Sequence, residues 1–334
     1  MEPLVFEPFL RPQVWGGKRL ANFGKHLPAG DSGIGESWEL SSHPLHVSRV
    51  AYGSHAGRQL SDLWDIDRES LVGSRYVGPE RFPLLIKLLN CEEPLSVQVH
   101  PGDGDSKRLG LSDPGKCEAW VVLETSPRAR LDAGLKNGVD RAEFERRLNA
   151  GSVDQSLNHL TPEVGDCLYL PSGTVHSARG GVVLIEVQPS SDSTFRLYDW
   201  GRLDARGQAR PLHRERGLQV IDWSLGPLGF VTSATTLPLA GGATMTQLLA
   251  TPKFDLNRYD LRRAYSPHDL AGRMVAWVVM AGATQLRSSG VTLSLNRGQT
   301  VLVPASAGVI EWDPGEGERV SLIAVTLGPE FETR

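Results

Sequence analysis

The stretch GDCLYLPSGTVH, residues Gly165–His176, decides the fold of this 334-residue chain. A glycine turn at its start leads into the apolar run Cys167–Leu170, and Pro171 with Gly173 then forces a second turn. The pattern predicts a strand, a tight turn and a second strand, Val182–Val187, with the histidine at its start. Because an ordinary hairpin with a histidine at its corner would look the same, the segments upstream must decide whether this histidine binds a metal.

Two upstream segments carry polar side chains at alternating positions, so each set projects from one face of a strand. The segment LSVQVH carries Ser96, Gln98 and His100, and the segment GKCEAW carries Lys116 and Glu118. We expect the two strands to be neighbours, with both polar faces directed toward the same site.

Four of these side chains form a candidate set of oxygen and nitrogen ligands: Gln98, His100, Glu118 and His176. Two imidazoles, a carboxylate and an amide oxygen suit Zn²⁺ at neutral pH, although Mn²⁺, Fe²⁺ or Ni²⁺ could also be held. Each residue alone has an ordinary structural explanation, such as a polar position on a strand. Their conjunction favours a metal site that keeps room for water or substrate, which predicts catalysis rather than a closed structural site.

The composition is that of a turn-rich globular protein. Hydrophobic residues make up 40% and charged residues 22% of the chain, which is enough apolar material for a large core. The 36 glycines and 22 prolines favour a β-rich fold over a helix bundle, because both residue types mark turns. The net charge of −4 and the lack of a Lys/Arg block argue against a nucleic-acid partner.

No segment predicts export or membrane insertion. The residues after Met1, EPLVFEPFLRP, have neither the basic nor the apolar region of a signal peptide, and no apolar run is long enough to span a bilayer. The three cysteines are far apart and form no CxxC pair: Cys91, Cys117 and Cys167. We therefore expect reduced, buried thiols in a cytoplasmic protein.

Periodicity predicts few helices. Residues 61–76 and Asp140–Asn149 are predicted helices, Ser152–Leu157 is a predicted short one, and Phe82–Asn90 (FPLLIKLLN) is a predicted buried strand.

The spacing in Gly165–His176 resembles the second sequence motif of cupin barrels, in which the histidine points into the barrel and binds a metal. A weak internal repeat, Gly298–Val309 (GQTVLVPASAGV), aligns with it and has Val309 at the histidine position. We predict an all-β fold (mainly), with two cupin-type jelly-roll barrels and a few short helices. The catalytic domain would span 1–218 and a degenerate second domain 219–334, joined by an Arg-rich linker near 203–218. Chance similarity between two hairpins is the alternative.

Taken together, the motifs resemble those of the type I mannose-6-phosphate isomerases. The resemblance covers roughly residues 5–205, and the segments that carry it are WGG (Trp15–Gly17), GESW (Gly35–Trp38), LSVQVHP (Leu95–Pro101), GKCEAW (Gly115–Trp120), LPSGTVH (Leu170–His176) and SSDSTFRLYDWGR (Ser190–Arg202). Larger family members have His or Pro around the lysine where this chain has Gly115 and Cys117, and some have tyrosine where it has Ala178. These departures suggest the shorter bacterial branch.

The resemblance implies the interconversion of mannose 6-phosphate and fructose 6-phosphate through a cis-enediol, with one zinc ion per chain on the four candidate ligands. It implies catalytic roles for Lys116, Asp192 and Arg196. Substrate contacts are expected from Ser96 and Arg202 at the phosphate and from Glu36 and Trp15 at the pocket mouth. The base stays open among Lys116, Asp192 and a metal-bound water. Arg196 could instead pair with Asp192 or Asp199, and Trp15 could simply be core.

Two other functions remain open. One is a different metal-dependent sugar-phosphate isomerase or epimerase, and the other is a sugar-binding cupin without turnover. Lys116 and Arg196 argue against the second, because a binding module needs no proton-transfer group. The expected partner is a small-molecule sugar phosphate, with no nucleic acid and no membrane, bound by a monomer or homodimer.

Overall fold

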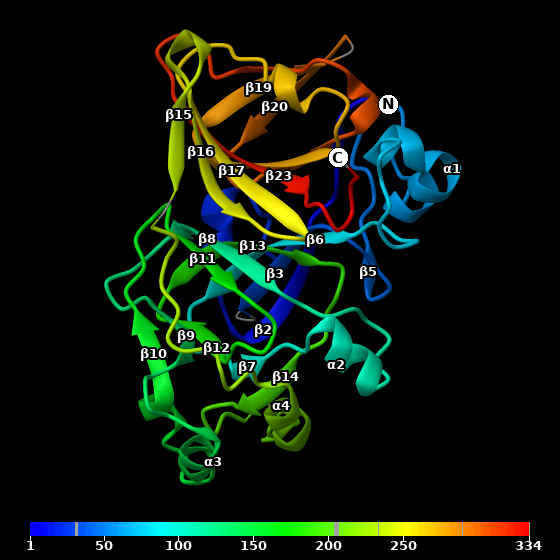
Figure 1. Ribbon diagram of the computed structural model, residues 1–334. Coiled ribbons are helices and arrows are strands. Elements are labelled where there is room, and N and C mark those ends of the chain that lie inside the picture. The colour runs from blue at the N-terminus through cyan, green and yellow to red at the C-terminus, as the bar shows by residue number, and fades with distance from the viewer. Residues whose placement is uncertain (31–32, 204–206, 233, 289, 334) are drawn as a thin grey trace.

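Antiparallel β-sheets form the layers of this protein, with the strands of residues 9–198 at one end and those of residues 235–327 at the other (Figure 1). The computed structural model describes residues 1–30, 33–203, 207–232, 234–288 and 290–333. The all-β fold class is confirmed.

Two sheets of the N-terminal part face each other. A six-stranded sheet has the order β11-β8-β13-β6-β3-β2. Its strands are β2 (Phe9–Gly17), β3 (Ile34–Leu40), β6 (Leu84–Cys91), β8 (Glu118–Glu124), β11 (Cys167–Leu170) and β13 (Val182–Pro189). A five-stranded sheet has the order β10-β9-β12-β7-β14. Its strands are β7 (Val97–Val99), β9 (Arg130–Leu135), β10 (Leu157–Leu160), β12 (His176–Arg179) and β14 (Phe195–Tyr198).

Two further sheets make up the C-terminal part. The seven-stranded sheet consists of β1 (Leu4–Val5), β15 (Thr235–Pro238), β16 (Thr244–Ala250), β17 (Phe254–Leu261), β18 (Val275–Ala281), β21 (Thr300–Val303) and β23 (Val320–Leu327). The three-stranded sheet consists of β19 (Ala283–Ser288), β20 (Val291–Asn296) and β22 (Glu311–Asp313). Because β1 pairs with β21, the N-terminus lies beside the C-terminal strands (Figure 1).

The remaining elements are short. A two-stranded ribbon joins β4 (Ser42–His43) and β5 (His46–Val47), and the α-helices are α1 (Leu60–Val72), α2 (Asp103–Arg108), α3 (Arg141–Asn149) and α4 (Arg214–Val220). The 3₁₀ turns are η1 (Arg19–Phe23), η2 (Val153–Ser156), η3 (Ala240–Gly242), η4 (His268–Leu270) and η5 (Ala305–Ala307). The predicted helices thus correspond to α1, α3 and the turn η2. Within the described residues, no helix has the length and apolarity needed to cross a membrane.

Side chains of the six-stranded sheet alternate between its two faces, and each face packs against a different part of the protein. On β6, Ile86 and Leu88 belong to the core shared with Phe254 and Ile323 of the seven-stranded sheet. The intervening residue Lys87 points the other way and lines a cavity. One face of the sheet therefore joins the two halves of the protein, and the other face is free to build a site.

The predicted internal repeat appears as a repeated strand order. Strand β18 pairs with β21 and β23 as β8 pairs with β11 and β13, and β19 pairs with β20 and β22 as β9 pairs with β10 and β12. Val309, which the sequence alignment sets opposite His176, is exposed. Strand register places the buried Trp312 there instead, because Trp312 opposes the fourth residue of β19 as His176 opposes the fourth residue of β9.

Two details of the sequence-based expectation are wrong. His176 does not begin the strand at 182–187 but a short strand of its own, β12, which lies in the other sheet. The strands that carry Gln98 and Glu118, β7 and β8, are not neighbours but belong to opposing sheets. Residue 218 lies within α4, residues 204–206 of the expected linker lie outside the described residues, and the division at 218/219 stays a prediction.

Candidate metal centre and active-site cavity

The candidate ligands meet between the two N-terminal sheets. Gln98 on β7 and His176 on β12 are register partners in the five-stranded sheet, and His100 directly follows β7. Glu118, the first residue of β8, comes from the opposing sheet. The ligand set is thus closed across the barrel interior rather than along one sheet.

Three of these residues lie within metal-binding distance of one another. The ligand atoms of His100, Glu118 and His176 all lie within 4.8 Å, and all three residues are buried. Each imidazole Nε2 is 3.3 Å from a different oxygen of the Glu118 carboxylate. Among the described residues this is the one such group of His, Cys, Asp and Glu side chains found.

The second nitrogen of each ring fixes its orientation. His100 Nδ1 lies 2.9 Å from the carbonyl oxygen of Ser193, and His176 Nδ1 lies 2.9 Å from that of Thr174. A carbonyl can only accept, so each Nδ1 carries the proton and each Nε2 presents a lone pair to the centre.

The unsatisfied atoms at this centre fit a cation. His100 Nε2 and both carboxylate oxygens of Glu118 are buried and make no hydrogen bond among the described residues, although Lys116 Nζ forms an ion pair with Glu118 Oε2 at 3.0 Å. Burial also lowers the pKa of His100 to about 3, with Lys116 adding to the effect, so the ring is neutral. For Glu118, burial opposes ionisation, but the ammonium group of Lys116 outweighs it and holds the pKa of Glu118 well below the usual range. Neutral imidazoles and an ionised carboxylate are the forms in which these groups bind a metal.

Gln98 is adjacent to the centre but presents its amide nitrogen. Its Nε2 is 3.2 Å from His176 Nε2, while its Oε1 lies 3.3 Å from the hydroxyl of Ser96. Rotating the amide by a half turn would exchange the two atoms and direct the oxygen at the centre.

A cavity of about 220 Å³ lies beside the ligands. It is lined by Arg11, Gln13, Trp15, Glu36, Lys87, Leu89, Leu95, Ser96, Gln98, Lys116, Glu186, Asp192, Thr194, Arg196 and Arg210. Five of these side chains are cationic and three are carboxylates. The cavity therefore favours an anionic occupant.

Comparison with known proteins shows the family of this chain. The phosphomannose isomerase type I catalytic domain matches residues 5–119. The mannose-6-phosphate isomerase ManA of Bacillus subtilis is 37% identical over 221 residues, 66% of this chain and 68% of that protein. The mannose-6-phosphate isomerase of Streptococcus mutans is 31% identical over 305 residues, 91% of this chain and 92% of that protein. The chain belongs to the type I phosphomannose isomerase family.

The fold is that of the family over the whole chain. The crystal structure of the mannose 6-phosphate isomerase from Bacillus subtilis superposes with a TM-score of 0.87 at 27% identity, covering 97% of this chain and 99% of that one. The expected resemblance to this family is confirmed, and it extends beyond residue 205 into the second barrel.

Most site residues expected from the family resemblance surround the cavity. Ser96, Lys116, Asp192 and Arg196 line it, as do Glu36 and Trp15. Trp15 also belongs to a buried hydrophobic cluster, and its role toward a substrate stays a prediction.

Glu36 is held in place by three donors. It accepts hydrogen bonds from Arg11 at 3.1 Å, Gln13 at 2.8 Å and the indole of Trp38 at 2.7 Å. Arg11 in turn lies 3.7 Å from Asp192. This arrangement positions Arg11 and Asp192 at the cavity wall.

The two candidate arginines differ in position. Arg196 Nη1 donates to the carbonyl oxygen of Pro211 at 2.9 Å, burial and the nearby Arg210 lower its pKa, and within the described residues it forms no ion pair with Asp192 or Asp199. Arg202 is absent from the cavity lining and instead donates to Asp199 at 2.5 Å. Arg210, which sequence reasoning missed, lines the cavity and binds the same carboxylate at 2.6 and 2.8 Å.

Sequence reasoning also missed a buried ion pair in this family member. Lys87 Nζ lies 3.0 Å from Glu186 Oε1, and both side chains are 4% exposed. Glu186 also accepts from the indole of Trp120 at 3.0 Å and lies 3.8 Å from Lys116 Nζ. A signal was present, because each charge interrupts an apolar strand, LLIKLLN and VVLIEVQ, where an unpaired charge is not tolerated.

Proposed function

We propose that this chain is a zinc-dependent mannose-6-phosphate isomerase that interconverts mannose 6-phosphate and fructose 6-phosphate. The observation that carries the proposal is the set of unsatisfied ligand atoms on His100 and Glu118, next to a cavity with more cations than carboxylates. A metal would satisfy the ligand atoms, and the phosphate of a phosphorylated sugar would satisfy the excess of cations in the cavity. The chain's relatives carry the name of this activity.

We assign one zinc ion per chain to His100, Glu118 and His176, with Gln98 as the fourth ligand after rotation of its amide. When bound there, the metal supplies a Lewis acid that polarises the sugar oxygens and stabilises their negative charge. The second barrel has no comparable set among its described residues, since Val275 is the β18 counterpart of Glu118 and Trp312 that of His176.

We assign proton transfer between C2 and C1 to Lys116. Its Nζ lies 3.0 Å from Glu118 Oε2, lines the cavity and is almost fully buried, so it can reach a sugar held beside the ligands without exposing the cis-enediol to bulk water. Asp192, 3.8 Å from Lys87, is the alternative proton-transfer group. Arg196, always charged and a planar donor, would steady the developing enediolate.

We propose that Arg210 and Ser96 bind the phosphate, and that Arg202 acts indirectly. Arg210 uses one edge of its guanidinium for Asp199, and among the described residues no other partner of this group is found, so its remaining N–H donors would bind phosphate oxygens. Arg202 binds the same Asp199 from outside the cavity, so it would hold that carboxylate, and through it Arg210, in place.

A coupled assay tests the proposal. The protein is stripped of metal with a chelator and reloaded with Zn²⁺, and mannose 6-phosphate is supplied with glucose-6-phosphate isomerase and glucose-6-phosphate dehydrogenase. NADPH should form with the reloaded protein and not with the stripped one. A different ketose or epimer as product would favour the second enzyme function, and metal-dependent binding without turnover would favour a sugar-binding cupin.

Three further assignments stay predictions. A cytoplasmic location, a monomer or homodimer, and the division of the chain into domains at 218/219 follow from the sequence alone. Size-exclusion chromatography with light scattering would measure the oligomeric state.

A further inference from the structure

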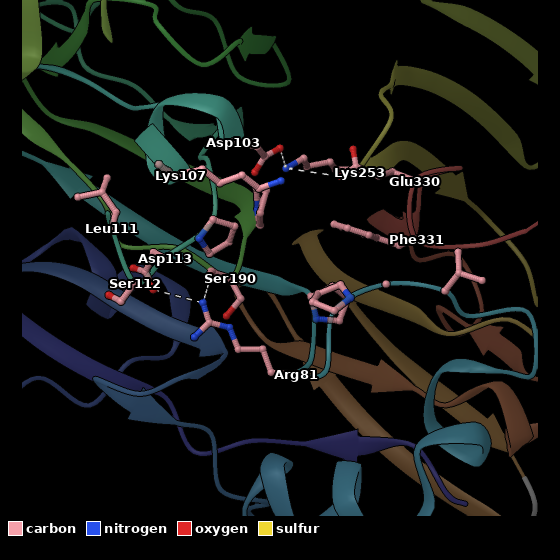
Figure 2. A pocket seen from close by; sticks show the side chains of 17 residues that line it. Arg81, Asp103, Lys107, Leu111, Ser112, Asp113, Ser190, Lys253, Glu330 and Phe331 are labelled. Atoms are coloured by element: carbon pink, nitrogen blue, oxygen red, sulfur yellow. Dashed lines mark hydrogen bonds and ion pairs between the residues drawn. The ribbon is translucent and has the colours of Figure 1, made fainter. Parts of the chain in front are cut away.

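A second cavity, of about 600 Å³, lies outside the catalytic one and takes its walls from both halves of the protein. We call it the interface cleft. It is lined by Val77, Gly78, Pro79, Arg81, Pro83, Asp103, Ser106, Lys107, Leu111, Ser112, Asp113, Pro114, Pro189, Ser190, Lys253, Glu330 and Phe331. In Figure 2, Lys107 and Lys253 lie along one edge, Arg81 along the opposite edge and Phe331 between them.

Two buried hydroxyls at this cleft have no partner. Ser106 is 3% exposed and Ser190 is 2% exposed, yet the Oγ atom of each makes no hydrogen bond in the described protein. A buried hydroxyl without a partner costs free energy, so such groups are normally satisfied by protein, water or a ligand. Both residues line the interface cleft, which makes its interior a site for hydrogen-bond acceptors.

Of the three cationic side chains that line the cleft, two form ion pairs with carboxylates of the cleft. Three cations and three carboxylates line it, so charge alone selects no ligand. Arg81 pairs with Asp113 at 3.2 Å, and Lys253 pairs with Asp103 at 2.6 Å and approaches Glu330 at 3.8 Å. For Lys107, no ion pair is found among the described residues. Its charge helps to lower the pKa of Asp103, but without an ion pair of its own among these residues it is the cation that a ligand can use.

The other walls are apolar and rigid. Pro79, Pro83, Pro114 and Pro189 contribute fixed backbone, and Phe331 contributes an aromatic ring. A cavity of this size that combines apolar walls with charged and hydroxyl groups is within the range of small-molecule sites. We propose that the interface cleft is a second, non-catalytic binding site for a small organic oxyanion, a phosphate or carboxylate carried on an apolar body, with Lys107, Ser106 and Ser190 binding the charged group.

The cleft shares a wall with the catalytic segment. Asp113 accepts a hydrogen bond from the backbone N–H of Asp192 at 2.9 Å as well as from Arg81. Ser191, the neighbour of Ser190, donates to the carbonyl oxygen of Pro114 at 2.8 Å. A ligand held in the interface cleft thus contacts the far side of the segments that bear Lys116 and Asp192.

The test uses phenyl phosphate and benzoate as the two oxyanion probes, benzyl alcohol as the neutral probe and the full-length protein, with binding followed by saturation-transfer NMR and titration calorimetry. Wild-type protein should bind at least one oxyanion probe and bind benzyl alcohol much more weakly. Lys107→Met should weaken binding about tenfold or more, the effect of losing one charge-assisted hydrogen bond. Ser190→Ala removes a hydroxyl that bonds nothing in the described protein, so it should weaken binding without unfolding it.

Two controls separate this site from the catalytic cavity. Lys136→Met removes an exposed lysine elsewhere, whose Nζ contacts the carbonyl oxygen of Gln155, and should leave probe binding unchanged. Arg210→Ala alters the catalytic cavity, so it should weaken any phenyl phosphate bound there and leave the Lys107-dependent binding unchanged. Equal binding of benzyl alcohol, no binding of either oxyanion, or binding that Arg210→Ala abolishes and Lys107→Met does not would each overturn the assignment. None of these readouts requires isomerase activity.

Discussion

The buried pair of Lys87 and Glu186 gives the sharpest prediction about stability. Lys87→Met keeps the length and apolar stem of the side chain but removes the cation 3.0 Å from Glu186, with both side chains 4% exposed. Glu186 would then keep the Trp120 N–H and lie 3.8 Å from Lys116. Breaking one side of a buried ion pair costs about 3–5 kcal/mol, because the remaining charge stays desolvated. We expect a loss of this order in the free energy of unfolding.

The measurement is urea denaturation of the zinc-loaded protein at pH 7, followed by circular dichroism. Burial disfavours the cation, but Glu186, Glu36 and Asp192 outweigh it and raise the pKa of Lys87. The pair's stabilisation is therefore fully present below the pKa of an unfolded lysine, about 10.4, and the assay at pH 7 measures all of it.

A double-mutant cycle isolates the charge. Glu186→Gln still accepts from Trp120, so Lys87→Met combined with Glu186→Gln should be more stable than Lys87→Met alone, with a coupling of about 0.5–3 kcal/mol. Lys87→Arg, which keeps the charge, is the matched control. A Lys87→Met protein within about 1 kcal/mol of wild type would refute the reasoning, since it falls well below the cost of an unpaired buried charge.

Four further outcomes are expected. His176→Ala should lose metal occupancy and turnover together, since losing a ligand costs more than the roughly 10–100-fold typical of its outer-shell partners; normal activity with full metal would contradict the site. Arg210→Ala should raise KM for the sugar phosphate about 10- to 150-fold with little change in kcat, because one charge-assisted hydrogen bond that is made equally in the ground and transition states is lost. Arg202→Ala should raise KM less. A larger KM effect for Arg202→Ala would show that Arg202, not Arg210, binds the phosphate. Burial opposes ionisation of Asp199, but Arg210 and Arg202 outweigh it and lower its pKa. The stabilisation from these ion pairs is therefore complete above the pKa of an unfolded aspartate, about 3.9, and is lost as the pH falls below that value. Asp199→Asn should flatten the acid side of a plot of unfolding free energy against pH, and an unchanged acid side would contradict the ion pairs of Asp199 with Arg210 and Arg202. Truncation after residue 218 should give aggregated protein, because it uncovers the apolar face that β6 shares with the second barrel; a soluble, active fragment would contradict this. Metal analysis of the full chain should find one ion per chain, and two tightly held ions would contradict the absence of a second site.

Local patterns in the sequence are enough for the fold class and for the ligand types. Side-chain alternation on LSVQVH and the turn residues of GDCLYLPSGTVH depend only on neighbours in the chain, so the sequence by itself places Gln98 and His100 on one strand face and His176 at the end of a turn. The repeat of that turn as GQTVLVPASAGV likewise indicates a second barrel. The helix Arg141–Asn149 follows from its cap, Asp140, whose side chain accepts from the Glu143 N–H.

Long-range pairing decides what local pattern cannot. Sequence spacing does not say which sheet a strand joins, so it sets β7 and β8 side by side, whereas they face each other across the barrel and close the site from two sides. For the same reason the sequence does not distinguish Arg210 from Arg202. Both arginines bind the carboxylate of Asp199, and only the folded chain shows that Arg210 is the one that lines the cavity. Nor does the sequence show the Lys87–Glu186 pair, whose members are far apart in sequence and pair only because β6 and β13 lie next to each other in register. The sequence gives the chemical type of each side chain, but only the packing of the strands determines which charged groups pair.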